Sequence, residues 1–71
     1  MTIAQRRAQE FITMYGGTSK VAEMLGTNKQ TISTWKKRGI PEGMAYKITV
    51  LTRGVVSVVW LRPDLFKEED L

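Results

Sequence analysis

The chain has 71 residues, no cysteine, no histidine and a formal net charge of +4, so we expect one domain with a thin core. Without cysteine and histidine the chain can form no disulfide and lacks the commonest general base and metal ligands. Four of its seven carboxylates fall within residues 64–71. We therefore expect no enzyme activity, cofactor, metal site or small-molecule ligand. No apolar run approaches the ~20 residues of a membrane span, and the opening MTIAQRRAQE lacks the apolar region of a signal peptide, so we expect a cytoplasmic protein with no membrane partner.

The first expected helix covers residues 3–15. Apolar residues recur on one of its faces with the helical period: Ile3, Ala4, Ala8, Phe11, Ile12 and Tyr15. Thr2 is a suitable N-cap for this helix. Gly16 and Gly17 end it, because glycine readily adopts the left-handed conformation that closes helices.

A second, short helix is expected next, with Thr18 or Ser19 as its N-cap. Three apolar residues lie on one side of it: Val21, Ala22 and Leu25. Gly26 ends the helix and starts a tight turn.

A third helix is expected from Lys29 to about Arg38. Asn28 is a good N-cap for it, and Gly39 ends it. Ile32 and Trp35 lie three residues apart on one face, which indicates that both side chains belong to the core.

A fourth helix begins near Pro41, because proline is favoured in the first turn of a helix. Glu42 in that turn complements the helix dipole. Inward positions follow at helical spacing: Met44 or Ala45, Ile48 and Leu51. We expect the helix to reach about Thr52 and to close at Arg53–Gly54.

The apolar segment 55–60 has two interpretations. Its density of valine favours a strand, whereas Ser57 could cap a short helix that carries Val58 and Leu61 inward. We favour the short helix. From Asp64 onward we expect an acidic, frayed tail.

Residues 18–38 have the order and spacing of a helix-turn-helix, which presents its second helix to the major groove of DNA. Ala22 is small where two helix backbones approach, and Gly26 supplies the left-handed residue of the turn. The apolar contacts that fix the crossing angle come from Leu25, Ile32 and Trp35. Each feature also occurs in ordinary helical bundles, but together they favour DNA binding.

The charge distribution agrees with this interpretation without deciding it. Residues 1–63 carry ten Lys or Arg and three acidic residues, a net of +7, and residues 64–71 carry one lysine and four acidic residues, a net of −3. A basic body attracts polyanions, although small proteins often carry some excess lysine.

Polar side chains are expected on the outward face of the third helix, where they could reach base edges: Lys29, Gln30, Ser33 and Thr34. Phosphate contacts are expected from two further groups. One is the basic end of that helix, with Lys36, Lys37 and Arg38. The other is the start of the preceding helix, whose amides and dipole favour an anion, with Thr18, Ser19 and Lys20.

Four stretches of the chain resemble a known family: GTSKVAEMLGTNKQTISTWK (17–36), GIPEGMAYKI (39–48), LTRGVV (51–56) and LRPDLF (61–66). They resemble the Cro proteins of lambdoid phages and prophages and are similar to the related YdaS-type prophage regulators. The resemblance covers most of residues 15–66.

This resemblance implies transcriptional repression by a homodimer on a short palindromic operator. It implies base reading by Asn28 together with the four outward residues of the third helix, and phosphate contact by Thr18, Ser19 and the basic cluster after Trp35. The family varies between strand and helix after Gly54, so the dimer surface is left open here. Trp60 either covers the core, which we favour, or anchors the dimer.

Taken together, the sequence predicts an all-α, compact lambda-repressor-like helix-turn-helix bundle of four to five short helices; the alternative is an α+β fold with a C-terminal strand at about 55–60. One domain spans residues 1–66, and residues 67–71 form a disordered acidic tail. The favoured function is a sequence-specific, double-stranded DNA-binding transcriptional regulator that acts as a dimer. The alternative is a protein-interaction module or antitoxin-type regulator that uses the apolar segment 55–66.

Overall fold

The computed structural model describes residues 2–66, which form five helices and no strand. The helices are α1 (Ile3–Met14), α2 (Thr18–Leu25), α3 (Lys29–Arg38), α4 (Glu42–Leu51) and α5 (Val58–Leu61). The predicted all-helical bundle is confirmed, and the alternative strand at 55–60 is wrong because α5 begins at Val58 and no residue of this segment is in a strand. The predicted tail 67–71 lies outside the described residues.

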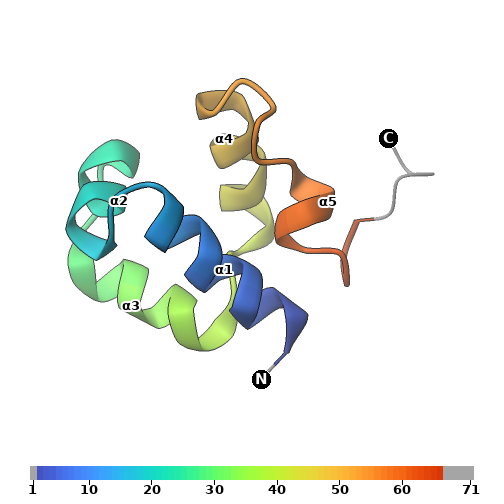
Figure 1. Cartoon of the computed structure of the whole chain (residues 1–71), viewed down its shortest axis with the longest axis horizontal. Coiled ribbons are helices and arrows are strands. Elements are labelled where there is room, and N and C mark those ends of the chain that lie inside the picture. The colour runs from blue at the N-terminus through green and yellow to red at the C-terminus, as the bar shows by residue number, and fades with distance from the viewer. Residues whose placement is uncertain (1, 67–71) are drawn as a thin grey trace.

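Helix α1 crosses the middle of the molecule, with α2 and α3 on one side and α4 and α5 on the other (Figure 1). It contacts α2, α3 and α5, whereas α4 packs mainly against α5. No helix in the part of the chain that the structure describes is long and apolar enough to cross a membrane.

The start of α1 is fixed by a reciprocal pair of hydrogen bonds. The Thr2 hydroxyl accepts from the Gln5 backbone amide at 3.2 Å, and the Gln5 side-chain oxygen accepts from the Thr2 amide at 2.7 Å. The Thr2 cap is therefore confirmed. The predicted inward face is buried at four positions: Ala4, Ala8, Phe11 and Ile12. Tyr15 is half-buried, and Ile3 at the helix start is exposed.

The turn between α2 and α3 forms as predicted. Gly26 adopts the left-handed conformation, with φ 69° and ψ 33°, and the Thr27 amide donates to the Ala22 carbonyl at 2.9 Å. The Asn28 side chain then caps α3 by accepting from the Thr31 amide at 2.9 Å. The helix runs over the predicted residues, with Ile32 and Trp35 buried.

The core lies where the five helices meet. Its largest fully buried side chains are Phe11, Ile12, Val21, Ile32, Ile40, Ile48, Val56 and Leu61. The predicted inward position of Leu51 is wrong, because Thr52 lies four residues after Ile48 and takes that place, leaving Leu51 exposed. The Thr52 hydroxyl donates to the Ile48 carbonyl at 2.8 Å and accepts from the Val56 amide at 3.1 Å, so its burial leaves no unmet hydrogen bond.

The valine-rich segment forms a helix because its start is capped and its inward residues reach the core. The Ser57 hydroxyl accepts from the Trp60 amide at 3.1 Å, and Val58 and Leu61 are buried. Trp60 is half-buried against this core. The Arg7 guanidinium stacks 4.7 Å from the Trp60 ring centroid and donates to the Trp60 carbonyl at 3.1 Å.

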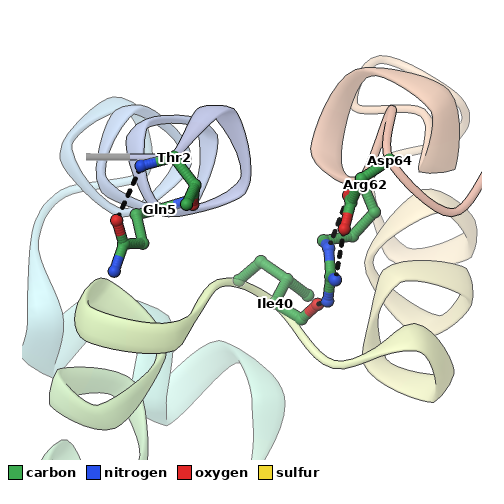
Figure 2. Close-up of polar contacts among 5 residues, drawn as sticks. All are labelled: Thr2, Gln5, Ile40, Arg62 and Asp64. Atoms are coloured by element: carbon green, nitrogen blue, oxygen red, sulfur yellow. Dashed lines mark hydrogen bonds and ion pairs between the residues drawn. The ribbon is translucent and has the colours of Figure 1, made fainter.

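The chain beyond α5 is held to the body by Arg62. Its guanidinium donates to the Ile40 carbonyl at 2.7 Å and forms a two-point ion pair with Asp64 at 3.0 and 2.7 Å (Figure 2). Hydrogen bonding from Arg62 holds the pKa of the Asp64 carboxyl below its ordinary value. Phe66 is buried. The expectation of a frayed tail from Asp64 is therefore wrong for residues 64–66, because the local ion pair with Arg62, the long-range bond from Arg62 to Ile40 and the burial of Phe66 order them.

Gly39, between α3 and α4, provides a test of this packing. Its φ is 94°, and a Cβ added there would lie 3.0 Å from the Ala4 Cβ. We expect Gly39→Ala to lower the free energy of unfolding by about 1–3 kcal/mol, through backbone strain and the clash with α1. Gly43→Ala is the matched control, because a Cβ there meets open space and a gain of up to about 1 kcal/mol is expected. Equal effects of the two substitutions in urea unfolding would contradict this account.

Candidate nucleic-acid interface

The outward side of α3 gathers the residues that the sequence predicts to read bases. Successive residues of an α-helix are rotated by about 100°, so five exposed residues share one continuous arc: Lys29, Gln30, Ser33, Thr34 and Lys37. Ile32 and Trp35 lie on the opposite, buried side. We call this arc the α3 face.

Some polar groups near this face are already occupied. The Asn28 side-chain oxygen accepts the bond that caps α3, so its amide nitrogen is the group best placed to bind a ligand. The Thr34 hydroxyl donates to the Gln30 carbonyl at 3.0 Å and keeps its acceptor capacity. Among residues 2–66, the side chains of Lys29, Gln30 and Ser33 make no hydrogen bond. These three side chains are therefore the groups best able to bind a ligand.

The start of α2 is open toward solvent. Gly17 occupies the N-cap position with φ 99° and provides no side-chain cap, so the predicted cap by Thr18 or Ser19 is wrong. Thr18 is instead the first helical residue. The first helical hydrogen bond is donated by the Val21 amide to the Gly17 carbonyl, at 3.0 Å. The amides of residues 18–20 are left for an outside acceptor. An anion is favoured at such a helix start.

The C-terminal end of α3 is held by two glutamines of α1. The Gln9 side-chain nitrogen donates to the Lys36 carbonyl at 3.0 Å, and the Gln5 side-chain nitrogen donates to the Lys37 carbonyl. Figure 2 shows the Gln5 side chain extending from α1 toward α3. The last carbonyls of a helix have no partner within it, so these two bonds both satisfy them and fix the direction of α3.

Sequence reasoning missed this role of the glutamines. The spacing of Thr2 and Gln5 is that of a capping box, which is a local signal. The bonds to residues 36 and 37 join segments 27 and 32 positions apart, and no local pattern indicates them. Arg6, which is exposed beside Gln5 on α1, is a further cation that the sequence analysis did not assign.

The surface around the α3 face is basic. Residues 18–38 hold five cations and one acidic residue, Glu23, which is a net of +4. Four of the cations belong to α3, and they are Lys29, Lys36, Lys37 and Arg38. Lys37 and Arg38 are exposed, and Lys36 is half-buried. The cations at the end of α3 complement the helix dipole and also create a positive potential that attracts phosphates.

The two glutamine contacts can be tested directly. In a Gln5→Ala/Gln9→Ala variant we expect faster hydrogen exchange at the amides of residues 35–39, because two carbonyls of the last turn of α3 lose the side-chain donors that bind them. The expected cost in stability is about 0.5–1.5 kcal/mol for each bond. Glu10→Ala, an exposed change on the same helix, serves as the control. Exchange rates that match the control throughout α3 would show that the glutamines do not hold this helix.

One comparison with known proteins gives a match. The family model described as "Bacterial toxin YdaS" matches residues 8–70, which includes α2, α3 and the turn between them. This match supports a phage-type regulator family in general terms. No curated protein and no solved structure matches the chain significantly.

Proposed function

We propose that this chain, which belongs to the Bacterial toxin YdaS family, is a sequence-specific double-stranded DNA-binding regulator of transcription. In its finer form the proposal is a Cro-like phage or prophage repressor that binds a palindromic operator as a homodimer in the bacterial cytoplasm. One observation carries it: the α3 face presents exposed polar side chains, and it lies between the uncapped start of α2 and the basic end of α3. We propose that it acts by binding alone, without catalysis.

Base recognition is assigned to Asn28 and to the α3 face apart from Lys37. A helix-turn-helix places the N-terminal part of its second helix in the major groove. There Gln30 can pair with adenine through two hydrogen bonds, and Lys29 can donate to guanine O6 and N7. Ser33 and Thr34 are short and suit either base, and the amide nitrogen of Asn28 can donate at the helix start.

Phosphate contacts are assigned to both ends of the motif. The open amides of Thr18, Ser19 and Lys20 suit one phosphate. The cations after Trp35, which are Lys36, Lys37 and Arg38, suit the backbone on the other side of the groove. Such contacts fix the position of the module on DNA, whereas sequence specificity comes from the contacts with base edges. Gln5 and Gln9 support this arrangement because they hold the end of α3.

A toxin–antitoxin-like role is a second candidate, favoured by the family description. In the sequence analysis it depended on an apolar segment, residues 55–66, that would insert into a partner. Most of that apolar surface is used within the protomer, because four of its residues are buried: Val56, Val58, Leu61 and Phe66. Insertion would therefore require the core to open. A partner protein that stays bound through this segment after nuclease treatment would favour the second role.

Two substitutions separate base reading from phosphate binding. Gln30→Ala should relax discrimination at one base pair by about 1–3 kcal/mol, the value of a good two-point contact. Lys37→Ala should weaken binding to all sequences about equally and reduce the slope of log affinity against log salt by about 1. Fluorescence anisotropy with duplexes that differ by single base pairs, at several salt concentrations, measures both effects.

Both residues are exposed, so the variants should keep the circular dichroism spectrum of the parent. A uniform loss of affinity in both variants would contradict the assignment of reading and anchoring residues. Affinity that does not change with salt would contradict DNA binding by this face.

A further inference from the structure

A second surface of the chain is exposed and apolar. It comprises two residues of α4, Tyr46 and Val50, with Leu51 at the end of the helix and Val55 in the loop that follows; we call it the α4 face. Val50 and Val55 are each 76% exposed, and Tyr46 and Leu51 are 52% and 47% exposed. Val50 lies opposite the buried Ala45 and Ile48, and Tyr46 and Leu51 lie on either side of it around the helix.

The α4 face is ordered and lies away from the α3 face. The Tyr46 ring packs edge-on against Phe66, with ring centroids 5.2 Å apart, so its orientation is fixed by a buried neighbour. Lys47 donates to the Leu25 carbonyl at 3.3 Å, which draws its charge toward α2. In Figure 1, α4 lies across α1 from α2 and α3. An occupant of the α4 face would therefore leave the α3 face free.

The charges at the two ends of this face have opposite signs. Glu42 begins α4, and Arg53 follows its last turn; both are exposed. At 1.5 Å per residue, Glu42 lies about 9 Å from the level of Ile48, and Arg53 lies past the opposite end of the helix, two residues after Leu51. When reversed, the surface pairs an acid at one end with a base at the other, and the exposed Tyr46, Val50 and Leu51 lie between them. Lys47 is also exposed between Val50 and Leu51, and its bond to the Leu25 carbonyl directs its ammonium group toward α2.

We propose that the α4 face binds the α4 face of a second copy of this chain, with the two helices antiparallel about a twofold axis near the level of Ile48. Tyr46 then lies opposite Val50 of the second copy, and Glu42 lies opposite Arg53. A parallel arrangement would place like charges together. This surface deepens the proposed function, on which it rests, because a palindromic operator requires a twofold pair of α3 faces.

The size of the α4 face sets the strength of the pairing. One pair of short helices with a flanking loop residue buries less than the ~1,200 Å² of a standard interface. The dimer is therefore weak in solution, with a dissociation constant on the order of micromolar, and DNA strengthens it by holding two copies side by side.

Sedimentation equilibrium without DNA tests the pairing. The parent chain is expected to self-associate, and Val50→Lys to raise the dimer dissociation constant about tenfold or more. Met14→Lys is the matched control, since Met14 is an apolar residue of the last turn of α1 that is 57% exposed, and it should leave association unchanged. Thermal unfolding confirms that both variants fold.

Charge reversal tests the antiparallel geometry. Glu42→Arg alone should weaken association because it places two cations together, and Glu42→Arg/Arg53→Glu should restore the parent dissociation constant to within a few-fold. A chain that stays monomeric at millimolar concentration, or a double reversal that restores nothing, would overturn the proposal.

The outcome for DNA binding is separate. Val50→Lys should still bind a single half-site with the parent's preference at the base pair read by Gln30. Loss of that preference in a variant with an intact α3 face would count against the proposed function, whereas loss of self-association alone concerns only the α4 face.

Discussion

The end of α3 lies directly against the first two turns of α1, and the orientation of the α3 face depends on this contact. Only Ile32 and Trp35 of α3 are buried, so the core alone gives this helix two anchoring side chains. Gly39 closes the gap to Ala4, where a Cβ would not fit, and Gln5 and Gln9 bind the last carbonyls of α3. The polar and steric contacts together hold the helix so that its outer arc projects from the body.

The connection between α3 and α4, at Gly39 and Ile40, also links the two halves of the molecule. Ile40 follows Gly39, fills the core with its side chain, and offers its carbonyl to Arg62. The ion pair between Arg62 and Asp64 then fixes the chain after α5. As a result, α1 contacts this connection from one side and the C-terminal segment contacts it from the other. A connection fixed in this way keeps the exposed faces of α3 and α4 in a constant relative position.

Local signals account for what the sequence predicts well. The caps at Thr2, Asn28 and Ser57 need only a polar side chain three residues before an amide, and the outward arc of α3 follows from helical period alone. The errors have different causes. Thr52 takes the inward position expected for Leu51 because it lies four residues after Ile48 and its hydroxyl bonds to the Ile48 carbonyl and the Val56 amide. The order of residues 64–66 depends instead on a contact between distant segments, the bond from Arg62 to the Ile40 carbonyl. For the candidate site, the residues of the α3 face could be named in advance, but the two glutamines that hold α3 could not.

The central claim is that the α3 face selects a DNA sequence. Selection of bound duplexes from a random pool tests it most directly, because no operator has to be assumed. The account predicts enrichment of a palindrome whose half-sites lie about one helical turn apart, 10–10.5 base pairs from centre to centre. The contradictory result would be bound duplexes whose sequences are as random as the starting pool, although the affinity for DNA still falls with increasing salt. Binding would then be electrostatic and not sequence-specific.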